Sequence, residues 1–412
     1  MAKTFKRIVF FIVLTILSLH FGLAQEKPGE QSQKTGPKSR HYFLNASIFY
    51  PLSINKTKND TANINLSLFY GHIGGVEGVD LGGIVSVIKK ELKGLQITGA
   101  AGIAGDYMSG IQVSGLFNIA GDELKGAQFA GIGNIAGEES RGIQAAGIFN
   151  ITGDEFKGLQ GSGIFNITGE RFTGVQGSGI FNIVGEDFKG IQAGGIFNIT
   201  GEKFKGLQAA GIFNIAGDYI KGLQAAIINI TPDLQGIQLG IVNAAETVKG
   251  AQVGIINLSK KMQGVPVGVV NLSKDGRIRM TTWGSSIAAV NTGVKFMVKN
   301  IYSILYIGGI NLYKDIPGSI SYGFQYGFHI PVNNLFVNID LGYMKIDNKT
   351  WFKSVKGTPD HQVLKVRGML GIDISKRFSI FAGTGLRYIW DHSEAFRQGN
   401  MKPLFFAGIE LF

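Results

Sequence analysis

The chain has 412 residues, of which 17% are charged, and its formal net charge is +11 at pH 7. The basic residues are spread along the chain without a Lys/Arg run, which argues against a nucleic-acid partner and favours solvated turns and loops. The absence of cysteine excludes disulfides, thiolate metal sites and a lipid anchor on an N-terminal cysteine.

The first segment has the features of an export signal. Basic residues, including Lys6 and Arg7, precede an apolar stretch that ends in small residues. We therefore predict a signal peptide over residues 1–24 and a disordered linker, rich in Pro, Gly and charge, over residues 25–40. Beyond the signal, no apolar run approaches the roughly 20 residues of a membrane helix, so any membrane-spanning part must consist of strands.

Two runs within residues 41–70 alternate apolar and polar side chains with a period of two. The first run ends at Tyr50 and the second at Tyr70. This alternation predicts a pair of strands with one apolar face. We assign this N-terminal strand pair to a barrel that the C-terminal part of the chain completes.

Residues 71–273 form a tandem array of short repeats, of which GLQAAGIFNIAGDYIK, beginning at Gly206, is one unit. A fixed short period predicts one small structural unit copied along an axis. Two amide columns recur along the array, and we predict that both form structural ladders. Their members are Gln96, Gln112, Gln128, Gln144, Gln160, Gln176, Gln192, Gln208, Gln224 and Asn118, Asn134, Asn150, Asn166, Asn182, Asn198, Asn214, Asn229, Asn243, Asn257, Asn271.

The array shortens from sixteen to fourteen residues per unit near its end. The separation between the two columns falls from six residues, at Gln208 and Asn214, to five, at Gln238 and Asn243. A one-residue loss within a continuous strand would turn every following side chain to the other face, whereas a corner between two strands absorbs it. The pattern therefore favours a β-solenoid with stacked amides about 4.8 Å apart. An antiparallel meander, whose long strands form a barrel wall, stays open as the alternative.

Within each unit we expect a bend near the glycine that Gly211 represents, because glycine admits tight or positive-φ backbone. The next position, Ile212 in this unit, is Ile, Leu or Val from Leu116 to Val269. We expect this side chain to point into a core, and the more variable position of Phe213 to face a looser environment.

Residues 277–412 return to alternating strands joined by short and long connections in turn. Strands of about 10 residues with this loop asymmetry are typical of a bacterial outer-membrane barrel, while a soluble β-sandwich is the alternative. With the N-terminal pair, we count ten strands, with both ends of the array on the periplasmic side. The residues that we expect to line the barrel interior are Asp340, Lys365, Arg367, Asp373 and Arg387.

Two resemblances follow from these motifs. The end of the chain resembles outer-membrane β-barrel proteins, whose last strand closes with a terminal aromatic, here Phe412, that the insertion machinery reads; Gly408 and Glu410 on the same face depart from that pattern. The array resembles bacterial surface-repeat proteins with tandem GLQ…GIxN units, although the lipobox cysteine of their anchored members is missing. The resemblance implies a cell-envelope protein.

No constellation of residues points to catalysis. The histidines of the mature chain lack metal-ligand spacing, and the acid–base pairs of the repeat turns, such as Asp218 and Lys221, fit solvated turns without the calcium-binding GGxGxD core. We therefore predict no catalytic, cofactor or metal site.

The sequence thus predicts an all-β fold: a Gly-rich β-solenoid-like array of 16- then 14-residue units, joined to antiparallel transmembrane-type β-barrel strands. We expect a non-enzymatic outer-membrane protein with a structural or interaction role for the array. Its expected partners are the outer membrane and its insertion machinery, with envelope polysaccharide or another protein as further candidates. A secreted or surface adhesin-like binder and an outer-membrane pore with the repeats as barrel wall are the alternatives.

Overall fold

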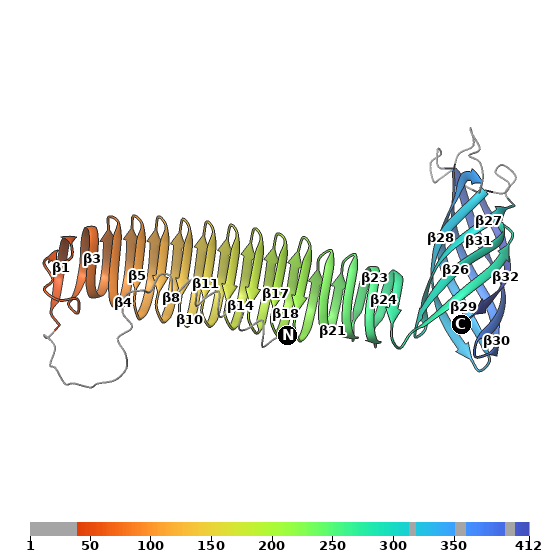
Figure 1. Cartoon of the computed structure of the whole chain (residues 1–412), viewed down its shortest axis with the longest axis horizontal. Helices are drawn as coiled ribbons and strands as arrows, with labels where there is room; N and C mark the ends of the chain where they lie inside the picture. Colours follow the sequence, from red (N-terminus) through yellow and green to blue (C-terminus); the bar gives the residue numbers. More distant parts are fainter. Residues whose placement is uncertain (1–38, 313–318, 351–359, 392–399, 412) are drawn as a thin grey trace. The chain divides into compact units, whose positions relative to one another are not determined.

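The fold is that of a computed structural model, which describes residues 39–312, 319–350, 360–391 and 400–411. All regular elements of these residues are strands, which confirms the predicted all-β class. The chain divides into two compact units, residues 1–232 and 233–412, each with its own topology (Figure 1). The predicted signal peptide and almost all of the predicted linker lie outside the described residues.

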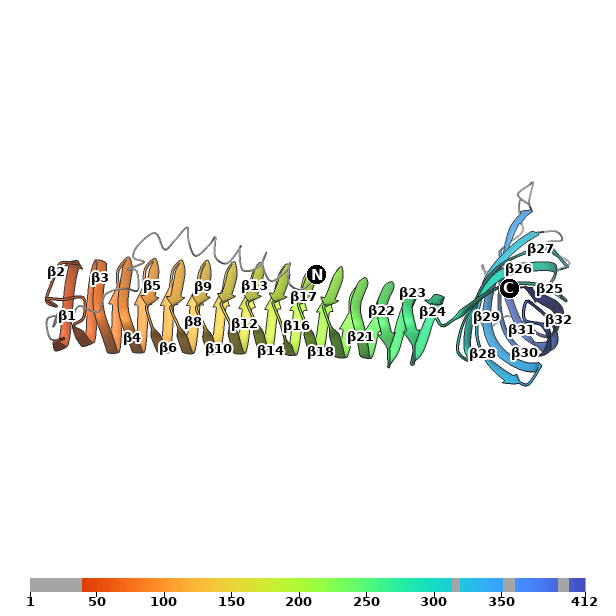
Figure 2. The same ribbon diagram turned by 60° about the horizontal axis from the view of Figure 1, so that its bottom comes forward.

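The first unit is a stack of coils in which each repeat supplies one long and one short strand. Strands of one kind pair in parallel with their copies in the neighbouring repeats, so that Gln144 lies opposite Gln160 and Asn150 opposite Asn166 (Figure 2). The long strands are the end of β4 (Val85–Thr98), β6 (Tyr107–Ser114), β8 (Glu123–Ala130), β10 (Glu139–Ala146), β12 (Glu155–Ser162), β14 (Arg171–Ser178), β16 (Phe188–Gly194), β18 (Lys203–Ala210) and β20 (Tyr219–Ala225). The short strands are β5 (Ala101–Ala104), β7 (Phe117–Ala120), β9 (Gly133–Ala136), β11 (Phe149–Thr152), β13 (Phe165–Thr168), β15 (Phe181–Val184), β17 (Phe197–Thr200), β19 (Phe213–Ala216) and the start of β21 (Ile228–Leu239).

This parallel pairing confirms the solenoid and rules out the meander, so the pore alternative with repeats as barrel wall is wrong. Our reason for favouring the solenoid, that a corner absorbs the lost residue, is also confirmed. Gln208 pairs with Gln224 and Asn214 with Asn229, so both columns stay in register across the first shortened repeat. The missing residue falls between β20 and β21, at a corner, where it leaves the side-chain alternation of both strands intact.

Each repeat has one glycine inside its long strand and one at the corner. The corner glycine is not the one with a positive φ, although we expected tight or positive-φ backbone there. The positive φ belongs to the glycine inside the long strand, such as Gly206 at +131°, and not to Gly211 at the corner. A Cβ on Gly206 would lie 1.9 Å from the carbonyl oxygen of Gly190, one rung before. The glycine of GLQ is therefore required both by its backbone conformation and by the close approach of consecutive rungs.

The N-terminal strands belong to the coil and not to the barrel, which corrects our assignment of residues 41–70. Strand β1 (His41–Phe49) pairs in parallel with β3 (Thr61–Gly82), and β3 continues in parallel with β4. The short β2 (Leu52–Ser53) folds back antiparallel onto the end of β1. Alternation alone did not distinguish these strands from barrel strands, because both kinds have one apolar outward face.

The second unit contains the last rungs of the array and a closed barrel. The end of β21 pairs with β23 (Ala251–Met262), and β23 pairs with β22 (Val242–Val248) and β24 (Val265–Ser273), all in parallel at the fourteen-residue spacing. The barrel strands are antiparallel and comprise β25 (Arg277–Ser285), β26 (Ala288–Val298), β27 (Ile301–Asn311), β28 (Ser319–Val332), β29 (Leu335–Thr350), β30 (His361–Ser375), β31 (Phe378–Asp391) and β32 (Asn400–Leu411). Pairing of β25 with β32 closes the ring.

The barrel therefore has eight strands and not the ten that we counted from the sequence. Its outward side chains are apolar and exposed, with Leu341 at 59% and Leu370 at 69%, while the alternate positions point inward and are buried. An eight-stranded barrel is narrow enough for its own side chains to fill it. The array enters β25 at the barrel end that carries the short connections after β26, β28 and β30.

Candidate functional site

The glutamine column lies inside the coil and forms one directional hydrogen-bond chain. Each Nε2 donates to the Oε1 of the glutamine one rung before it, for example from Gln160 to Gln144 at 2.9 Å and from Gln176 to Gln160 at 2.8 Å. All members from Gln96 to Gln224 are buried. In the second unit Gln252 donates to Gln238 at 2.9 Å, and the next position in that column is Pro266, which has no side-chain donor.

The asparagine column runs beside it with the opposite polarity. From Asn118 to Asn214, each Nδ2 donates to the Oδ1 of the asparagine one rung after it, as from Asn150 to Asn166 at 2.8 Å, and also to a backbone carbonyl of the following rung. The two columns thus carry amide dipoles that point in opposite directions along the coil, which limits their summed dipole. The structure therefore places the predicted ladder residues in two buried, hydrogen-bonded columns.

Asp80 ends the glutamine column at the N-terminal rungs. Gln96 Nε2 donates to its Oδ2 at 2.7 Å, and Asn65 Nδ2 donates to its Oδ1 at 2.5 Å from the other side. An aspartate, which has no donor when ionised, suits a position where two donors converge. Burial raises the pKa of Asp80, against the hydrogen bonds from Gln96, Ser86 and Asn65 that lower it. Asp80 was not among the ladder residues that we predicted from the sequence.

The other half of the interior is apolar. Phe156, Phe172, Phe188 and Phe204 are buried and stack with ring centroids 4.8–5.3 Å apart. They lie at the start of the long strands, next to the turn in which each repeat carries its acidic residue. On the outside of this half, Lys125 pairs with Glu123 at 2.8 Å and Lys157 with Glu155 at 3.3 Å. Both lysine side chains are about half exposed, so each pair contributes little to stability. We call this turn and its flanking charged residues the charged edge.

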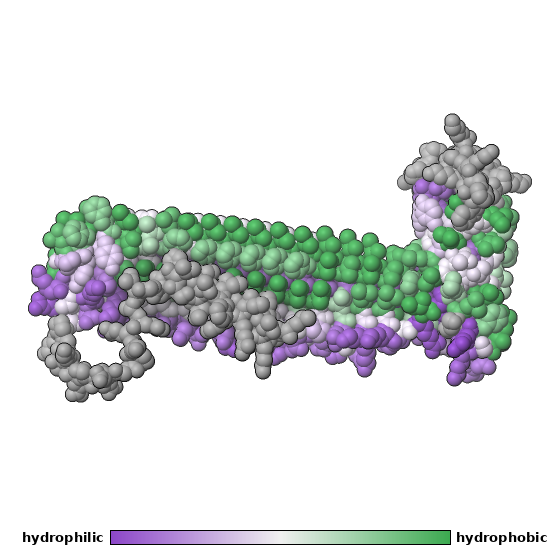
Figure 3. All heavy atoms as spheres, viewed as in Figure 1, coloured by the Kyte–Doolittle hydropathy of each residue, from purple (hydrophilic) through white to green (hydrophobic). Residues whose placement is uncertain are grey.

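The outer surface beside the amide columns is apolar. We call it the apolar strip, and it consists of three outward columns in each rung. The residue before each glutamine forms the first column, the corner hydrophobe the second and the first residue of the short strand the third; examples are Ile191, Ile196 and Phe197. The strip is apolar over the length of the first unit, and the charged edge lies on the opposite side (Figure 3).

The corner hydrophobe corrects one prediction. Ile212 points outward and is 45% exposed, whereas we expected it in the core. The side chain that fills the interior at this end of the rung is Asn214, and Phe213 stacks outside on Phe197 at 4.8 Å. An invariant aliphatic residue was taken for a core residue because soluble proteins bury such positions. Here the polar amides are inside and the aliphatic residues outside.

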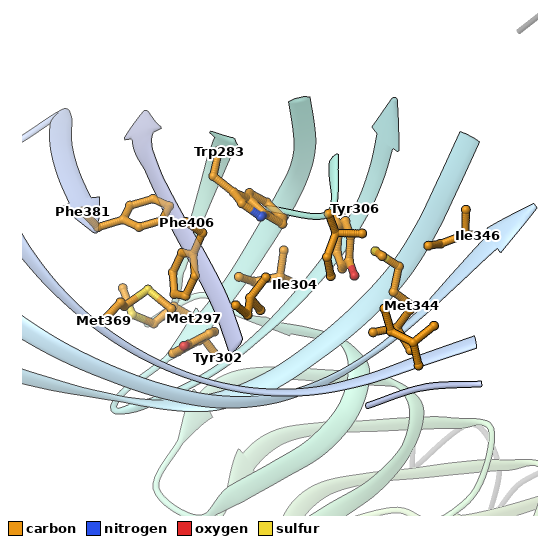
Figure 4. Packing of buried hydrophobic residues seen from close by; sticks show 14 of the residues in the cluster. Trp283, Met297, Tyr302, Ile304, Tyr306, Met344, Ile346, Met369, Phe381 and Phe406 are labelled. Atoms are coloured by element: carbon orange, nitrogen blue, oxygen red, sulfur yellow. The ribbon is translucent and has the colours of Figure 1, made fainter. Parts of the chain in front are cut away.

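The barrel interior contains two ion-pair clusters. It also contains buried aromatic side chains, among them Trp283, Tyr306 and Phe406 (Figure 4). Glu410 accepts from Lys295 Nζ at 2.7 Å and from Arg279 Nη1 at 3.0 Å. Asp340 accepts from Arg367 Nε and Nη2 at 2.8 Å, and from the hydroxyl of Tyr302 at 2.7 Å. Both buried carboxylates are therefore paired with cations. A further buried cation, Lys365, has its Nζ 4.5 Å from the centroid of the Tyr306 ring.

Of the five residues that we expected inside the barrel, Asp340, Lys365 and Arg367 are buried there. Asp373 and Arg387 are only partly buried, and Asp373 accepts from Ser379 near the short-turn end. The sequence analysis missed Arg279, Lys295 and Glu410, although all three follow the alternation of their strands. Glu410 was read as a departure from an apolar face, but that face is the barrel interior.

The described histidines have separate surroundings. His41 bonds to Thr61 and Asn63, and His329 bonds to Asn338 inside the barrel. Burial, reinforced by Lys58 and Lys89, lowers the pKa of His72 to about 4. His392 lies outside the described residues. Across the described ranges, His, Asp and Glu side chains nowhere gather in the groups of three that would hold a metal ion.

Within the same residues, no helix is long and apolar enough to span a bilayer. No protein-family model matches the chain, and no curated protein matches it significantly. Among solved structures, the chain is similar to the N-terminal β-barrel domain of OprF from Pseudomonas aeruginosa, with 14% identity over 33% of this chain and 99% of that domain and a TM-score of 0.23. It is also similar to Neisserial surface protein A, with 12% identity over 32% of this chain and 93% of that one and a TM-score of 0.20. Likeness at this level carries no argument about function.

Proposed function

We propose that this chain is a non-enzymatic outer-membrane protein whose barrel anchors the repeat array, and that the array has a structural or interaction role in the cell envelope. The polarity of the barrel is the observation that carries this proposal. Leu341, Leu370 and Phe405 are exposed on its outer wall, whereas Asp340 and Arg367 are paired in its interior. This arrangement suits a hydrocarbon surrounding and would expose a wide apolar surface in water.

The connections after β26, β28 and β30 support a periplasmic position of the array. Outer-membrane barrels place their short turns in the periplasm. The array joins β25 at the short-turn end of this barrel, so we infer that it lies in the periplasm. The chain contains no cysteine, and a single Lys203→Cys variant can therefore report this position through labelling. A membrane-impermeant maleimide should label that cysteine only after the outer membrane is permeabilised; labelling of intact cells would place the array outside.

The membrane location is tested by fractionation of a Gram-negative host that exports the full chain. We expect the protein in the outer-membrane fraction, with the heat-modifiable gel mobility of a closed barrel. Leu341→Arg, at an outward barrel position, should abolish both, because a cation facing lipid costs about 2–4 kcal/mol near the bilayer centre. Lys189→Glu, on the charged edge of the array, is the matched control and should insert normally. A freely soluble product would contradict the proposal and favour the secreted adhesin-like alternative.

A further inference from the structure

The two halves of each rung have opposite polarity patterns. Around the charged edge, charges lie outside and Phe156, Phe172 and their equivalents lie inside, as in a water-soluble protein. Around the opposite corner, aliphatic side chains lie outside and the Gln and Asn columns lie inside, as in a membrane barrel. The surface of one half of each rung therefore suits water, and the surface of the other half suits an apolar medium.

The backbone along the apolar half meets the requirement that hydrocarbon imposes. Lipid offers no hydrogen-bond partner, so each exposed N–H and C=O group must be paired within the protein. The corner, where a coil would normally leave groups for water, is paired from rung to rung. Gly163 N donates to Ala146 O, and Ile164 N and Phe165 N both donate to Ile148 O. The same pattern repeats at the next corner, where Ile180 and Phe181 bond to Ile164.

The shape of the apolar strip favours lipid over a second copy of this chain. The strip covers the outer face of the second half of each long strand, the corner and the outer face of the short strand, as Ile191, Ile196 and Phe197 illustrate. A second copy could cover one of the two faces at a time, whereas a fluid medium covers both faces and the corner together. A long strand of eight residues spans about 26 Å at about 3.3 Å per residue. Its apolar half therefore spans about 13 Å, close to half of a hydrocarbon core of about 30 Å.

We propose that the apolar strip of the array lies in the hydrocarbon of a single phospholipid leaflet, with the charged edge at the headgroups and in water. The array then runs along the membrane surface as an interfacial β-coil. Like an interfacial amphipathic helix, it places its apolar side in hydrocarbon and its charged side in water. The occupant of the strip is acyl-chain lipid. This inference rests on the proposed envelope function only in that a bilayer must be within reach, and it is tested at different residues.

The absence of cysteine allows single spin labels to report the depth of each half. Ile191 and Lys189 are both outward-facing and exposed on β16, two positions apart, one in the strip and one at the charged edge. Leu341→Cys, on the outer wall of the barrel, reports barrel insertion separately. The mature full chain with each label is reconstituted into phosphatidylcholine/phosphatidylglycerol vesicles, and collision with oxygen and with a water-soluble nickel chelate is measured.

We expect the label at Ile191→Cys to collide with oxygen and to lose its collisions with the nickel chelate, as the label at Leu341→Cys does. The label at Lys189→Cys should show the reverse. Nickel accessibility at Ile191→Cys with protection at Leu341→Cys overturns the leaflet proposal and leaves the barrel proposal standing. Protection at Ile191→Cys with nickel accessibility at Leu341→Cys supports the leaflet proposal and overturns the barrel proposal, and nickel accessibility at both overturns both.

Self-association gives a distinct signature. If a second copy covers the strip, the label at Ile191→Cys is immobile, is protected from both reagents and shows dipolar coupling between copies; that result overturns the leaflet proposal.

A further variant keeps the test independent of labelling at one rung. Ile143→Glu together with Val175→Glu places charges at exposed strip positions of the neighbouring rungs, and it should restore nickel collisions to a label at Leu159→Cys. Lys125→Glu with Lys157→Glu is the control and should leave that label protected. Circular dichroism checks that each variant retains its strands.

Discussion

Replacing Gln160 by leucine tests whether the buried amide column stabilises the coil. In the native chain Gln160 Nε2 donates to Gln144 at 2.9 Å and its Oε1 accepts from Gln176 at 2.8 Å. Leucine removes both bonds, so that Gln176 Nε2 is left as a buried donor without its acceptor. Gln144 Oε1 keeps only the longer bond from Thr152 Oγ1, at 3.3 Å. Each unsatisfied group costs about 1–3 kcal/mol, so the gross loss is about 2–6 kcal/mol. Burial of the apolar side chain returns part of it, and we expect a net loss of about 2–4 kcal/mol.

Hydrogen exchange, measured by mass spectrometry on the full chain in micelles, can show which rungs lose stability in Gln160→Leu. A coil of repeats is stabilised by nearest-neighbour contacts, so the effect should be confined to nearby rungs. We expect amides of residues 139–178 to exchange about 30- to 1,000-fold faster, since a tenfold change corresponds to about 1.4 kcal/mol. Lys157→Gln, exposed on the same strand, is the control and should change exchange little. Equal exchange in both variants would refute a stabilising role for the column.

Three further predictions concern the glycine ladder, the barrel interior and the end of the glutamine column. Gly206→Ala should cost more than about 1 kcal/mol, because φ is +131° and a Cβ would lie 1.9 Å from a carbonyl oxygen; Gly161→Ala, where a Cβ meets open space, should be nearly neutral in the same exchange measurement. Arg367→Gln should destabilise the barrel by about 3–5 kcal/mol and lower the temperature of its mobility shift on gels, because it leaves Asp340 buried without its cation; a shift of less than a few degrees would contradict this. The raised pKa of Asp80 means that the folded state holds this proton more tightly than the unfolded state, so stability of the first rungs should fall as pH rises above about 4 through the folded pKa. Amide exchange of residues 61–100 at several pH values should show this slope in the native chain and lack it in Asp80→Asn.

The two amide columns determine which residues of neighbouring rungs pair. Amide nitrogens of the Gln column point toward the N-terminal rungs and those of the Asn column toward the C-terminal rungs, as Gln160 and Asn150 illustrate. A register slip of one residue would place Gln160 outside and an aliphatic residue inside, which would leave amides of both neighbouring rungs unpaired. The columns therefore fix the register of parallel strands that repeat almost identical sequences.

Several features of the array followed from the sequence because they depend on spacing alone. Gln208 and Asn214 keep their partners when the repeat shortens, and this requires only that a strand alternates and that a corner does not. The barrel strands likewise followed from alternation, which also identified Asp340, Lys365 and Arg367 as inward residues.

The errors came where alternation has two interpretations. A strand with one apolar face looks the same whether that face meets a core or lipid, so Ile212 was assigned to the inside. The strands within residues 41–70 were assigned to the barrel for the same reason, although β1 and β3 are parallel neighbours. Strand direction is not encoded in the period of a strand.

The sequence by itself determined that the chain is all-β, how its repeats are spaced and which amides share a column, because the period of a repeat and the alternation of a strand are local properties. Only the tertiary structure decided that the barrel closes with eight strands and that the coil has amides beneath an apolar surface. Which partner a strand pairs with, and which face becomes the inside, depend on contacts between residues far apart in the chain. Those contacts are selected by the pairing of all backbone and buried polar groups at once, and no single repeat contains that information.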